Sequence, residues 1–282
     1  MSSPDLRDRR VLITGASTGI GRETARVLAA EHGAAVVAVA RTTSALDELV
    51  DELGGAPHAA LALDVGEADA WGAAAGALDG VTDLVCAAGV YGPVGTVGTW
   101  EPAEFADALR INVHGVLLAV HAVLGSVTAA RGSVVTFSGG GGAGPMPRYD
   151  AYATSKAAVV RLTENLGLDL ADRGVRVNAV APGFVATDIH RRTLEAGAER
   201  AGADFLERTR KVLAGGGVPP RLAADLVAFL LSPAAEGITG KLLSAQWDPW
   251  REPEFQARLV AEADLATIRR IDDEFFTAKS RT

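Results

Sequence analysis

The sequence predicts an α/β fold built on one doubly wound parallel sheet of about seven strands, with a helical insert and a C-terminal extension. Short apolar runs rich in Val, Ala and Leu alternate with helical patterns through the first two-thirds of the chain. This alternation is typical of parallel strands whose two faces are both covered by helices. A glycine-rich turn also leads from the first apolar run directly into a helical pattern, as is common at the first turn of such sheets.

Seven apolar runs are predicted as strands. They lie, in chain order, at residues 10–15, 34–40, 59–65, 83–89, 133–138, 175–182 and 238–245. The helical patterns between them cover residues 20–33, 44–55, 104–127 and 151–173. Ser44 is predicted as the N-cap of the second helix, and Gly33, Gly54 and Gly174 fall where helix C-caps belong.

Two segments interrupt the alternation of strands and helices. Residues 188–220 form an insert rich in Arg and Glu that we expect to be helical. Residues 247–282 form a charged tail after the last strand, expected to be helical from about Glu254. Neither segment carries enough apolar residues for a core of its own, so residues 1–282 are predicted to form a single domain.

The composition narrows the class of protein. Hydrophobic residues make up 48% of the chain and the net charge is −8, which argues against nucleic acid or an anionic membrane as a partner. The single cysteine, Cys86, excludes an intrachain disulfide and is typical of a reducing cytoplasm. The N-terminal residues have no apolar signal-peptide core, and no apolar run is expected to reach membrane-spanning length. We therefore expect a soluble, cytoplasmic protein.

The turn VLITGASTGIG carries glycines at Gly15, Gly19 and Gly21. Glycines at this spacing let the backbone turn tightly and approach a pyrophosphate, while the helix that follows supplies N–H donors and a positive dipole end. The alternative is a tight strand-to-helix turn that binds nothing.

The end of the second strand reads AVAR, with Arg41 where an acidic residue would bind an adenosine ribose 2′-hydroxyl. A guanidinium suits a 2′-phosphate instead, although Arg41 is alternatively a solvated loop residue. Asp64 ends the third strand and is well placed either for an adenine amino group or as a helix N-cap.

Several motifs occur together in a fixed order. They are TGASTGIG from Thr14, LDV around Asp64, AAG at Ala87–Gly89, Asn112 within RINVHG, Tyr152-x-x-x-Lys156, and APGFVATD from Ala181. Over residues 9–245 the chain resembles the classical short-chain dehydrogenase/reductase family. The resemblance implies a Rossmann fold, a nicotinamide cofactor, a substrate lid at the insert 188–220 and a homodimer or homotetramer. Arg41 resembles the family's NADP-preferring version, so NADP(H) is expected rather than NAD(H).

The resemblance also implies the residues of the site. The expected catalytic residues are Asn112, Ser138, Tyr152 and Lys156. The expected cofactor-binding residues are Gly15, Ser17, Thr18, Gly19, Ile20, Gly21, Arg41, Asp64, Val65, Ala87, Ala88, Gly89, Tyr152, Lys156, Pro182, Gly183, Val185 and Thr187. No metal is expected, because the five histidines show no ligand clustering.

Tyr152 and Lys156 lie one helical turn apart, which suits a proton-transfer pair. A free tyrosine has a pKa of about 10, and the Lys156 ammonium is expected to lower the pKa of Tyr152 by favouring the phenolate. In the family, the asparagine that Asn112 matches orders a water that passes protons to the lysine. A chance Tyr-x-x-x-Lys pair on a helix is the alternative.

The family pattern places its catalytic serine at Gly139, one residue after Ser138. Because Gly139 to Gly142 leave the loop free of side chains, we expect a one-residue shift that lets Ser138 serve as the donor to the substrate oxygen. Alternatively, Ser138 only ends the strand, and a water, a glycine N–H or Tyr149 contacts the oxygen.

Other residues have weaker patterns. Cys86 replaces a family asparagine and is expected to be a buried core thiol. His114 and His121 are expected to pack or to meet a partner subunit. Trp247 and Trp250 are expected to pack against the body of the protein or against a neighbouring subunit, with the further hypothesis that the tail walls the substrate pocket. In that hypothesis Arg148, Arg191 and Arg192 meet an anionic group of the substrate.

The predicted function is an NADP(H)-dependent oxidoreductase that interconverts a secondary alcohol and a ketone, with Tyr152 as the acid/base. Its partner is a small-molecule substrate, whose identity the sequence leaves open because pocket loops vary freely on this fold. The alternatives are an epimerase that oxidises and re-reduces its substrate with retained cofactor, and a non-catalytic NADP-binding protein.

Overall fold

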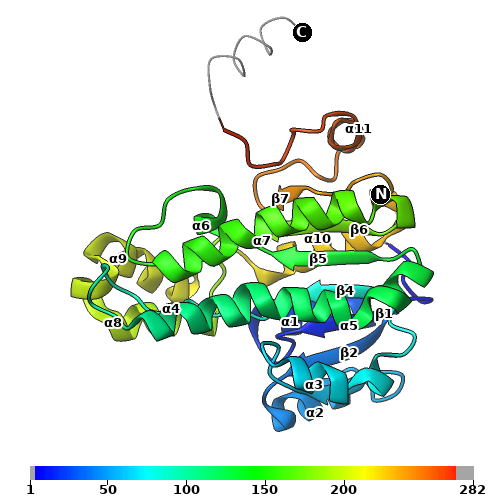
Figure 1. The fold of residues 1–282 in the computed structure, drawn as a ribbon, viewed down its shortest axis with the longest axis horizontal. Coiled ribbons are helices and arrows are strands. Elements are labelled where there is room, and N and C mark those ends of the chain that lie inside the picture. Colours follow the sequence, from blue (N-terminus) through cyan, green and yellow to red (C-terminus); the bar gives the residue numbers. More distant parts are fainter. Residues whose placement is uncertain (1–3, 271–282) are drawn as a thin grey trace, which may run out of the picture.

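The computed structural model describes residues 4–270 and confirms the doubly wound sheet. Seven parallel strands lie in the order β3-β2-β1-β4-β5-β6-β7, and each predicted run contains one of them (Figure 1). The strands are β1 Arg10–Thr14, β2 Ala35–Ala40, β3 Ala59–Ala62, β4 Asp83–Cys86, β5 Ser133–Phe137, β6 Arg176–Ala181 and β7 Leu242–Ser244.

The predicted helical patterns are confirmed as α1, α2, the α4–α5 run and α7. The helices of the described residues are α1 Gly19–Ala30, α2 Thr43–Glu52, α3 Ala68–Ala73, α4 Pro102–Leu109, α5 Gly115–Ala129, α6 Gly140–Ala143, α7 Asp150–Asp169, α8 Arg191–Ala201, α9 Ala203–Lys211, α10 Pro220–Leu231 and α11 Pro253–Ala261. The insert is helical as expected, since it contains α8 and α9. Helices α3, α6 and α10 were not predicted.

The predicted helix ends are partly right. Gly33, Gly54 and Gly174 all have left-handed φ angles, of 76°, 95° and 73°, which is why glycine suits these chain reversals. Ser44 was wrong as an N-cap: α2 begins at Thr43, and Thr42 takes the N-cap position without a side-chain hydrogen bond. Ser44 therefore lies inside the first turn of the helix.

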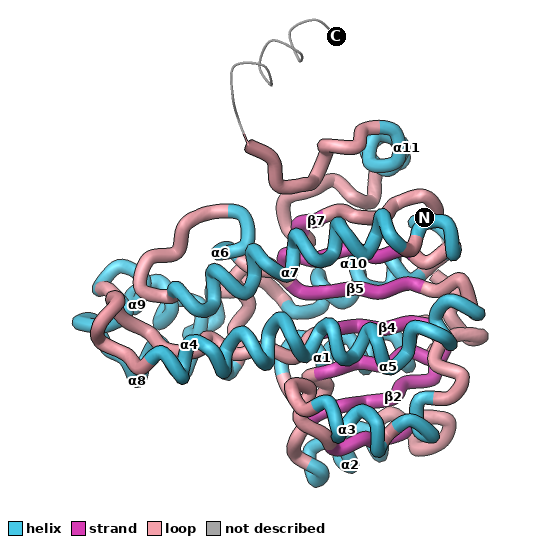
Figure 2. The backbone as a smooth tube through the Cα atoms, viewed as in Figure 1, coloured by secondary structure: helices cyan, strands magenta, loops and turns pink. Residues whose placement is uncertain are grey.

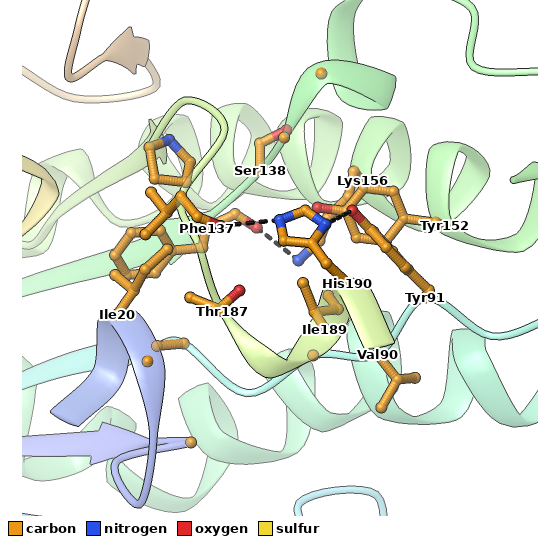
Figure 3. Close-up of a pocket in the computed structure, with 18 of the residues that line it drawn as sticks. Ile20, Val90, Tyr91, Phe137, Ser138, Tyr152, Lys156, Thr187, Ile189 and His190 are labelled. Atoms are coloured by element: carbon orange, nitrogen blue, oxygen red, sulfur yellow. Dashed lines mark hydrogen bonds between the residues drawn. The ribbon is translucent and has the colours of Figure 1, made fainter. Parts of the chain in front are cut away.

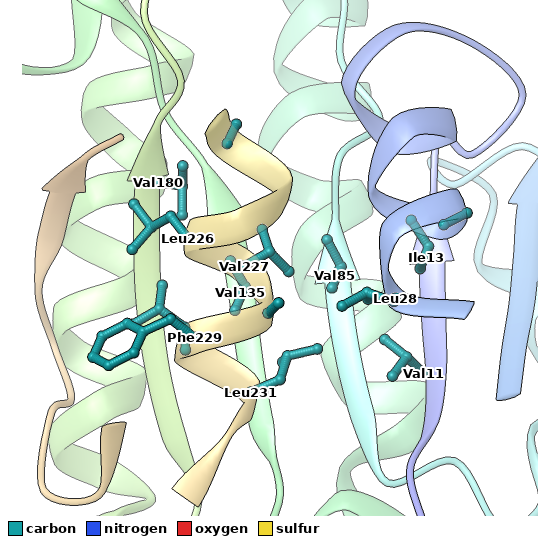
Figure 4. Packing of buried hydrophobic residues seen from close by; sticks show 14 of the residues in the cluster. Val11, Ile13, Leu28, Val85, Val135, Val180, Leu226, Val227, Phe229 and Leu231 are labelled. Carbon is teal, nitrogen blue, oxygen red and sulfur yellow. The ribbon is translucent and has the colours of Figure 1, made fainter. Parts of the chain in front are cut away.

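Two helical layers sandwich the sheet, because alternate strand residues point to opposite faces. Val11 and Ile13 point into a cluster with α1, α2 and α10, whereas Leu12 between them joins a cluster with α3, α5 and α7. Figure 4 shows the first cluster, in which Leu226 and Val227 of α10 pack against strand residues such as Val135.

The strand order reverses between β1 and β4, so the chain winds away from this point in both directions. Ligands of doubly wound sheets bind at the carboxyl ends of the strands where this reversal occurs. Gly15 follows β1 there with a φ of 68°, and a Cβ on it would lie 2.7 Å from the Ala88 Cα. Only glycine permits this close approach, which sets the floor of a crevice.

One helix corrects an expectation from the sequence. Helices α4 and α5 and the turn between them form a continuous helix, Pro102–Ala129, of 28 residues whose most apolar window has a mean hydropathy of 1.6. By length and composition alone this helix is able to cross a membrane, although no apolar run was expected to reach that length. Buried core helices pass the same test, and α5 contributes Val116, Val120 and Val123 to the core under the sheet.

The C-terminal tail packs on the edge of the sheet at β7, as Figures 1 and 2 show. The Lys241 ammonium donates hydrogen bonds to the carbonyl oxygens of Glu262 and Leu265, at 2.7 and 3.1 Å. The Leu242 N–H donates to the Ala266 carbonyl oxygen at 2.7 Å. Helix α11 agrees with the predicted helical start near Glu254; residues 271–282 of the predicted tail lie outside the described residues.

The two tail tryptophans have opposite environments. Trp250 is buried, its ring lies 5.6 Å from the Phe229 ring, and its Nε1–H donates to the Ala245 carbonyl oxygen at 3.2 Å. Trp247 is 78% exposed. Packing against the body is therefore confirmed for Trp250, whereas Trp247 does not pack against the body. Contact of Trp247 with a neighbouring subunit stays a prediction.

We expect Trp250→Ala to lower the free energy of unfolding by about 3–5 kcal/mol, because the substitution removes a large buried ring and its hydrogen bond. Urea denaturation followed by circular dichroism measures the change. Trp247→Ala is the matched control and should leave the unfolding midpoint nearly unchanged. Equal losses in the two variants would contradict the different packing of the two rings.

Candidate active site

A large cavity lies along the carboxyl ends of the strands, under α8 and α9. Its volume is about 1570 Å³, whereas the pocket for one drug-sized ligand has a volume of about 300–1,000 Å³. It is therefore large enough for two molecules side by side. Every residue predicted to bind the cofactor lines this cavity, and so does Ser138.

The glycine turn fits a dinucleotide. Residues 17–21 line the cavity just where α1 begins at Gly19, so the positive end of the helix faces it. A Cβ on Gly21 would collide with the Gly15 carbonyl oxygen, and a Cβ on Gly19 would lie 3.0 Å from the Thr187 methyl carbon. The turn is thus packed closely on itself at Gly21 and against the β6 loop at Gly19, which is why these two positions are glycine.

Arg41 and Asp64 lie at the rim, at the ends of β2 and β3. Arg41 is exposed and makes no hydrogen bond or ion pair with another residue of the described chain. Burial acts to raise the pKa of Asp64, but hydrogen bonds from the Gly66 N–H and the Arg110 guanidinium outweigh it and hold that pKa below its usual value. A free guanidinium beside an ionised carboxylate can bind a phosphate and an amino group together.

The predicted acid/base pair lies in the centre of the cavity. Tyr152 and Lys156 project from the first turns of α7, and the Lys156 Nζ is 5.6 Å from the centre of the Tyr152 ring. The Nζ also donates a hydrogen bond of 2.9 Å to the Phe137 carbonyl oxygen at the end of β5 (Figure 3). Strand β5 therefore positions the ammonium next to the phenol.

Burial controls how both groups titrate. It raises the pKa of Tyr152 to about 12 and lowers the pKa of Lys156 to about 8. The direction for Tyr152 is opposite to the one that the sequence predicted, because loss of hydration outweighs the nearby ammonium. Near neutral pH the phenol is thus protonated and the amine charged, which suits a proton donor more than a resting base.

Asn112 lies behind the cavity rather than on its wall. It occurs in a π-helical turn, Arg110–His114, in which the Gly115 N–H bonds to the Arg110 carbonyl. Its side chain donates to the Val90 carbonyl oxygen at 2.8 Å and accepts from the Val90 N–H at 2.8 Å. A further hydrogen bond of 2.9 Å joins it to the Ser155 hydroxyl. Asn112 therefore fixes the loop after β4 against α7.

Comparison with known proteins decides the family. The model of the short chain dehydrogenase family matches residues 9–197.

The chain belongs to the short-chain dehydrogenases.

Its relatives act on varied substrates. A galactitol 2-dehydrogenase (L-tagatose-forming) of Cereibacter sphaeroides is 36% identical over 82% of this chain and 91% of its own length. A 2,3-dihydro-2,3-dihydroxybenzoate dehydrogenase of Bacillus subtilis is 33% identical over 85% of this chain and 95% of its own. The structure of a variant actinorhodin polyketide ketoreductase with NADPH has a TM-score of 0.75 and 30% identity, covering 85% of this chain and 97% of that one.

Ser138 is not placed as predicted for the catalytic serine of a short-chain dehydrogenase. Its Oγ is buried and has no hydrogen-bond partner among residues 4–270, and a Cβ on Gly142 would collide with it. Gly139 instead faces the acid/base pair, since a Cβ there would lie 2.5 Å from the Tyr152 hydroxyl oxygen. Successive residues of this extended segment point to opposite sides, so the predicted one-residue shift does not occur. Figure 3 shows Ser138 apart from the Tyr152–Lys156 pair.

The sequence did not predict the group that surrounds Tyr152. All three tyrosines of the protein meet here: the Tyr91 ring lies edge-on, 4.7 Å from Tyr152 and 5.2 Å from Tyr149. The Tyr91 hydroxyl bonds to the His190 Nδ1 at 2.8 Å, and the His190 Nε2 bonds to the Val185 carbonyl oxygen at 2.8 Å. A carbonyl only accepts, so Nε2 donates. Burial lowers the pKa of His190, so the neutral ring accepts a hydrogen bond from the Tyr91 hydroxyl at Nδ1.

The three arginines predicted to meet an anionic group of the substrate also differ from the prediction. Arg148 donates to the Glu199 carbonyl oxygen and Arg191 pairs with Asp188 at 2.9 Å, so neither of them lines the cavity, and only Arg192 of the predicted set does. Arg208 and Lys211 of α9 line it as well, and so does Trp247 of the tail. Arg208 and Lys211 are three residues apart, and this spacing within the predicted helical insert indicated that they share one face of a helix.

The remaining candidate residues lie in surroundings that indicate no catalytic role. Cys86 is a buried thiol whose pKa is raised by burial to about 12, as expected for a core residue. His114 and His121 are exposed on the α5 run. Tyr149 is buried and bonds to the Thr193 hydroxyl at 2.9 Å, so its own hydroxyl is already engaged. Within residues 4–270, no cluster of His, Cys, Asp and Glu is arranged to hold a metal ion.

We expect Ser138→Ala to change kcat by less than about threefold, because its hydroxyl points away from the Tyr152 hydroxyl. Gly139→Ala should lower kcat by about tenfold or more, because the new Cβ displaces the Tyr152 hydroxyl from its position. Steady-state kinetics with saturating NADPH measures both. Gly139→Ser separates the two effects at this position: higher activity than Gly139→Ala would show that a hydroxyl there acts as a donor.

Proposed function

We propose that this short-chain dehydrogenase is an NADP(H)-dependent oxidoreductase that interconverts a secondary alcohol and a ketone. The observation that carries the proposal is the Tyr152–Lys156 pair in a cavity that also contains the glycine turn and the free Arg41 guanidinium. When bound, the cofactor supplies or accepts the hydride.

The residues of the chain supply the proton. In ketone reduction the Tyr152 hydroxyl donates its proton to the substrate oxygen, and the Lys156 ammonium stabilises the phenolate that forms. The Phe137 carbonyl holds that ammonium in place. In alcohol oxidation the same proton returns to Tyr152. The raised pKa of Tyr152 keeps the phenol protonated near neutral pH, which is the form that ketone reduction requires.

Two further residues position this pair. We assign Asn112 the family's role of holding a proton-relaying water near Lys156; the π-helical turn supports it, since such turns often occur at functional sites. Tyr91, held by His190, packs edge-on against the Tyr152 ring and so limits its rotation. Because Gly139 offers no side chain, the orientation of Tyr152 depends more strongly on these neighbours.

NADP(H) is the proposed cofactor rather than NAD(H). Arg41 follows Ala40 at the end of β2, where the adenosine ribose is held in this fold, and it makes no hydrogen bond or ion pair with another described residue. The related polyketide ketoreductase structure contains NADPH.

We also propose that copies of the chain associate in the cytoplasm as a homodimer or homotetramer. Leu117 of α5 and Leu168 of α7 are 45% and 71% exposed, and both helices cover the same face of the sheet. Exposed apolar side chains on one face often mark an interface. The buried, reduced Cys86 suits a reducing compartment. Analytical ultracentrifugation measures the assembly.

Tyr152→Phe tests the function. We expect this variant to lose nearly all turnover of a panel of ketones while still binding NADPH, because the phenol acts on the substrate oxygen and not on the dinucleotide. Tyr149→Phe is the matched control and should keep most of its turnover, since that hydroxyl bonds to Thr193. Substantial turnover by Tyr152→Phe would assign the proton to another residue.

Arg41→Ala tests the cofactor. We expect NADPH binding to weaken by about 1.5–3 kcal/mol, the contribution of a charged hydrogen bond, with a much smaller effect on NADH. Fluorescence titration of both dinucleotides measures the difference. Arg210→Ala, an exposed arginine outside the cavity, should affect neither. An equal loss for NADPH and NADH in Arg41→Ala would rule out recognition of the 2′-phosphate.

A further inference from the structure

One face of α9 points into the cavity. Phe205, Arg208 and Lys211 are spaced three residues apart and all line the cavity, as residues on one face of a helix should. Leu206 and Thr209 are buried on the other side. Helix α9 therefore presents an aromatic ring and two cations to the space beside Tyr152.

The ring of Phe205 is part of an aromatic surface. It stacks on Phe184 with a centroid distance of 5.7 Å and an interplanar angle of 21°. Phe184 also receives the edge of His190 at 4.5 Å. Only 5% of the chain is aromatic, so this concentration at one end of the cavity provides a flat surface on which a ring of the substrate can stack.

The Arg208 guanidinium is held at the border of that surface. Its central carbon lies 5.1 Å from the centre of the Phe184 ring, which orients the planar group without using its N–H donors. Arg208 and Arg192 make no ion pair or hydrogen bond with any other residue in the described range 4–270. The other cations nearby are compensated: Arg191 pairs with Asp188, and Lys211 lies 3.6 Å from Glu207.

These cations are separate from the proposed 2′-phosphate site. Arg41 follows β2, whereas the lid follows β6, and three strands lie between β2 and β6 in the sheet. At about 4.8 Å per strand this places the two ends about 19 Å apart. The uncompensated guanidiniums of the lid therefore face the substrate end of the cavity, in a protein whose net charge is −8.

We propose that the substrate is a ring-bearing ketone or alcohol with an anionic oxygen group, a carboxylate or a phosphate. The ring stacks on Phe184 and Phe205, and Arg208 binds the anionic group through its free N–H donors, with Arg192 adding positive potential. This inference deepens the proposed function and rests on it. The contact orients the substrate relative to Tyr152 by fixing the end opposite the reacting carbon.

Binding of three probes that differ only in the group on the ring tests the inference. The probes are benzoate, phenyl phosphate and benzamide, titrated by calorimetry into the NADPH-saturated protein. We expect at least one anion to bind about tenfold more tightly than benzamide, and the difference to shrink in high salt. The better of the two anions identifies the group. Equal binding of the three probes, or no binding of either anion, overturns the inference.

Arg208→Gln and its neighbour Arg210→Gln provide the matched pair. Both arginines are exposed on α9, but only Arg208 lines the cavity. Arg208→Gln should remove the preference for the anion, and Arg210→Gln should keep it. A similar loss in both variants would indicate a general charge effect. Weaker NADPH binding by Arg208→Gln would assign the cations to the cofactor; both results overturn the inference.

Turnover gives a second readout that also separates the two proposals. The ratio of kcat/KM for 4-acetylbenzoate to that for 4-acetylbenzamide should fall about tenfold in Arg208→Gln, through KM. If the wild type reduces neither ketone while anions still bind at Arg208, the assignment of the reaction fails and the anion site stands. If it reduces both equally well, the anion site fails and the reaction stands.

Discussion

The close approach of the first turn to the end of β4 determines the geometry of the site. Gly15 comes so near to Ala88 that no side chain fits between the two backbones. This contact occurs where the strand order reverses, so the segments on either side diverge and leave a crevice between them. Arg41 and Asp64 lie on one side of that crevice, and Gly139, Tyr152 and the β6 loop lie on the other. A bulkier turn would widen the separation of these two halves.

The reactive side chains are held mostly by backbone atoms of the strand ends. Lys156 bonds to the Phe137 carbonyl, Asn112 bonds to both backbone groups of Val90, and His190 bonds to the Val185 carbonyl. Such contacts fix where the backbone of Phe137, Val90 and Val185 must lie, but they do not depend on the side chains of these three residues. They explain how a site can keep Tyr152 in place although its neighbour at residue 139 is a bare glycine. They also connect the lid to the sheet through the chain of bonds from Tyr91 to His190.

The sheet, most of its helices and the glycine turn could be predicted from the sequence. Buried parallel strands are continuous apolar runs, and tight turns require glycine at fixed positions. The rest depended on features that have no local signal. The direction of Ser138 depends on the residue at which β5 ends, and the raised pKa of Tyr152 depends on its burial in the folded chain. Tyr91, one of the rings packed against Tyr152, is 61 positions away in the chain. In the π-helical turn at Asn112 a backbone N–H bonds five residues back instead of four. This change requires no particular residue type, so the sequence pattern did not indicate it. Trp247 and Trp250 differ only because one faces Phe229.

The packing of the tail on β7 has a consequence for the edges of the sheet. Strand β7 is an edge strand of three residues, and a free edge invites pairing with another chain. Here the Leu242 N–H is already bonded to the Ala266 carbonyl oxygen, and Lys241 binds the carbonyl oxygens of Glu262 and Leu265, which precede that residue. The tail thus covers the β7 edge and hinders a strand of another molecule from pairing with it. A strand of another molecule therefore meets backbone groups of β7 that are already bonded to the tail.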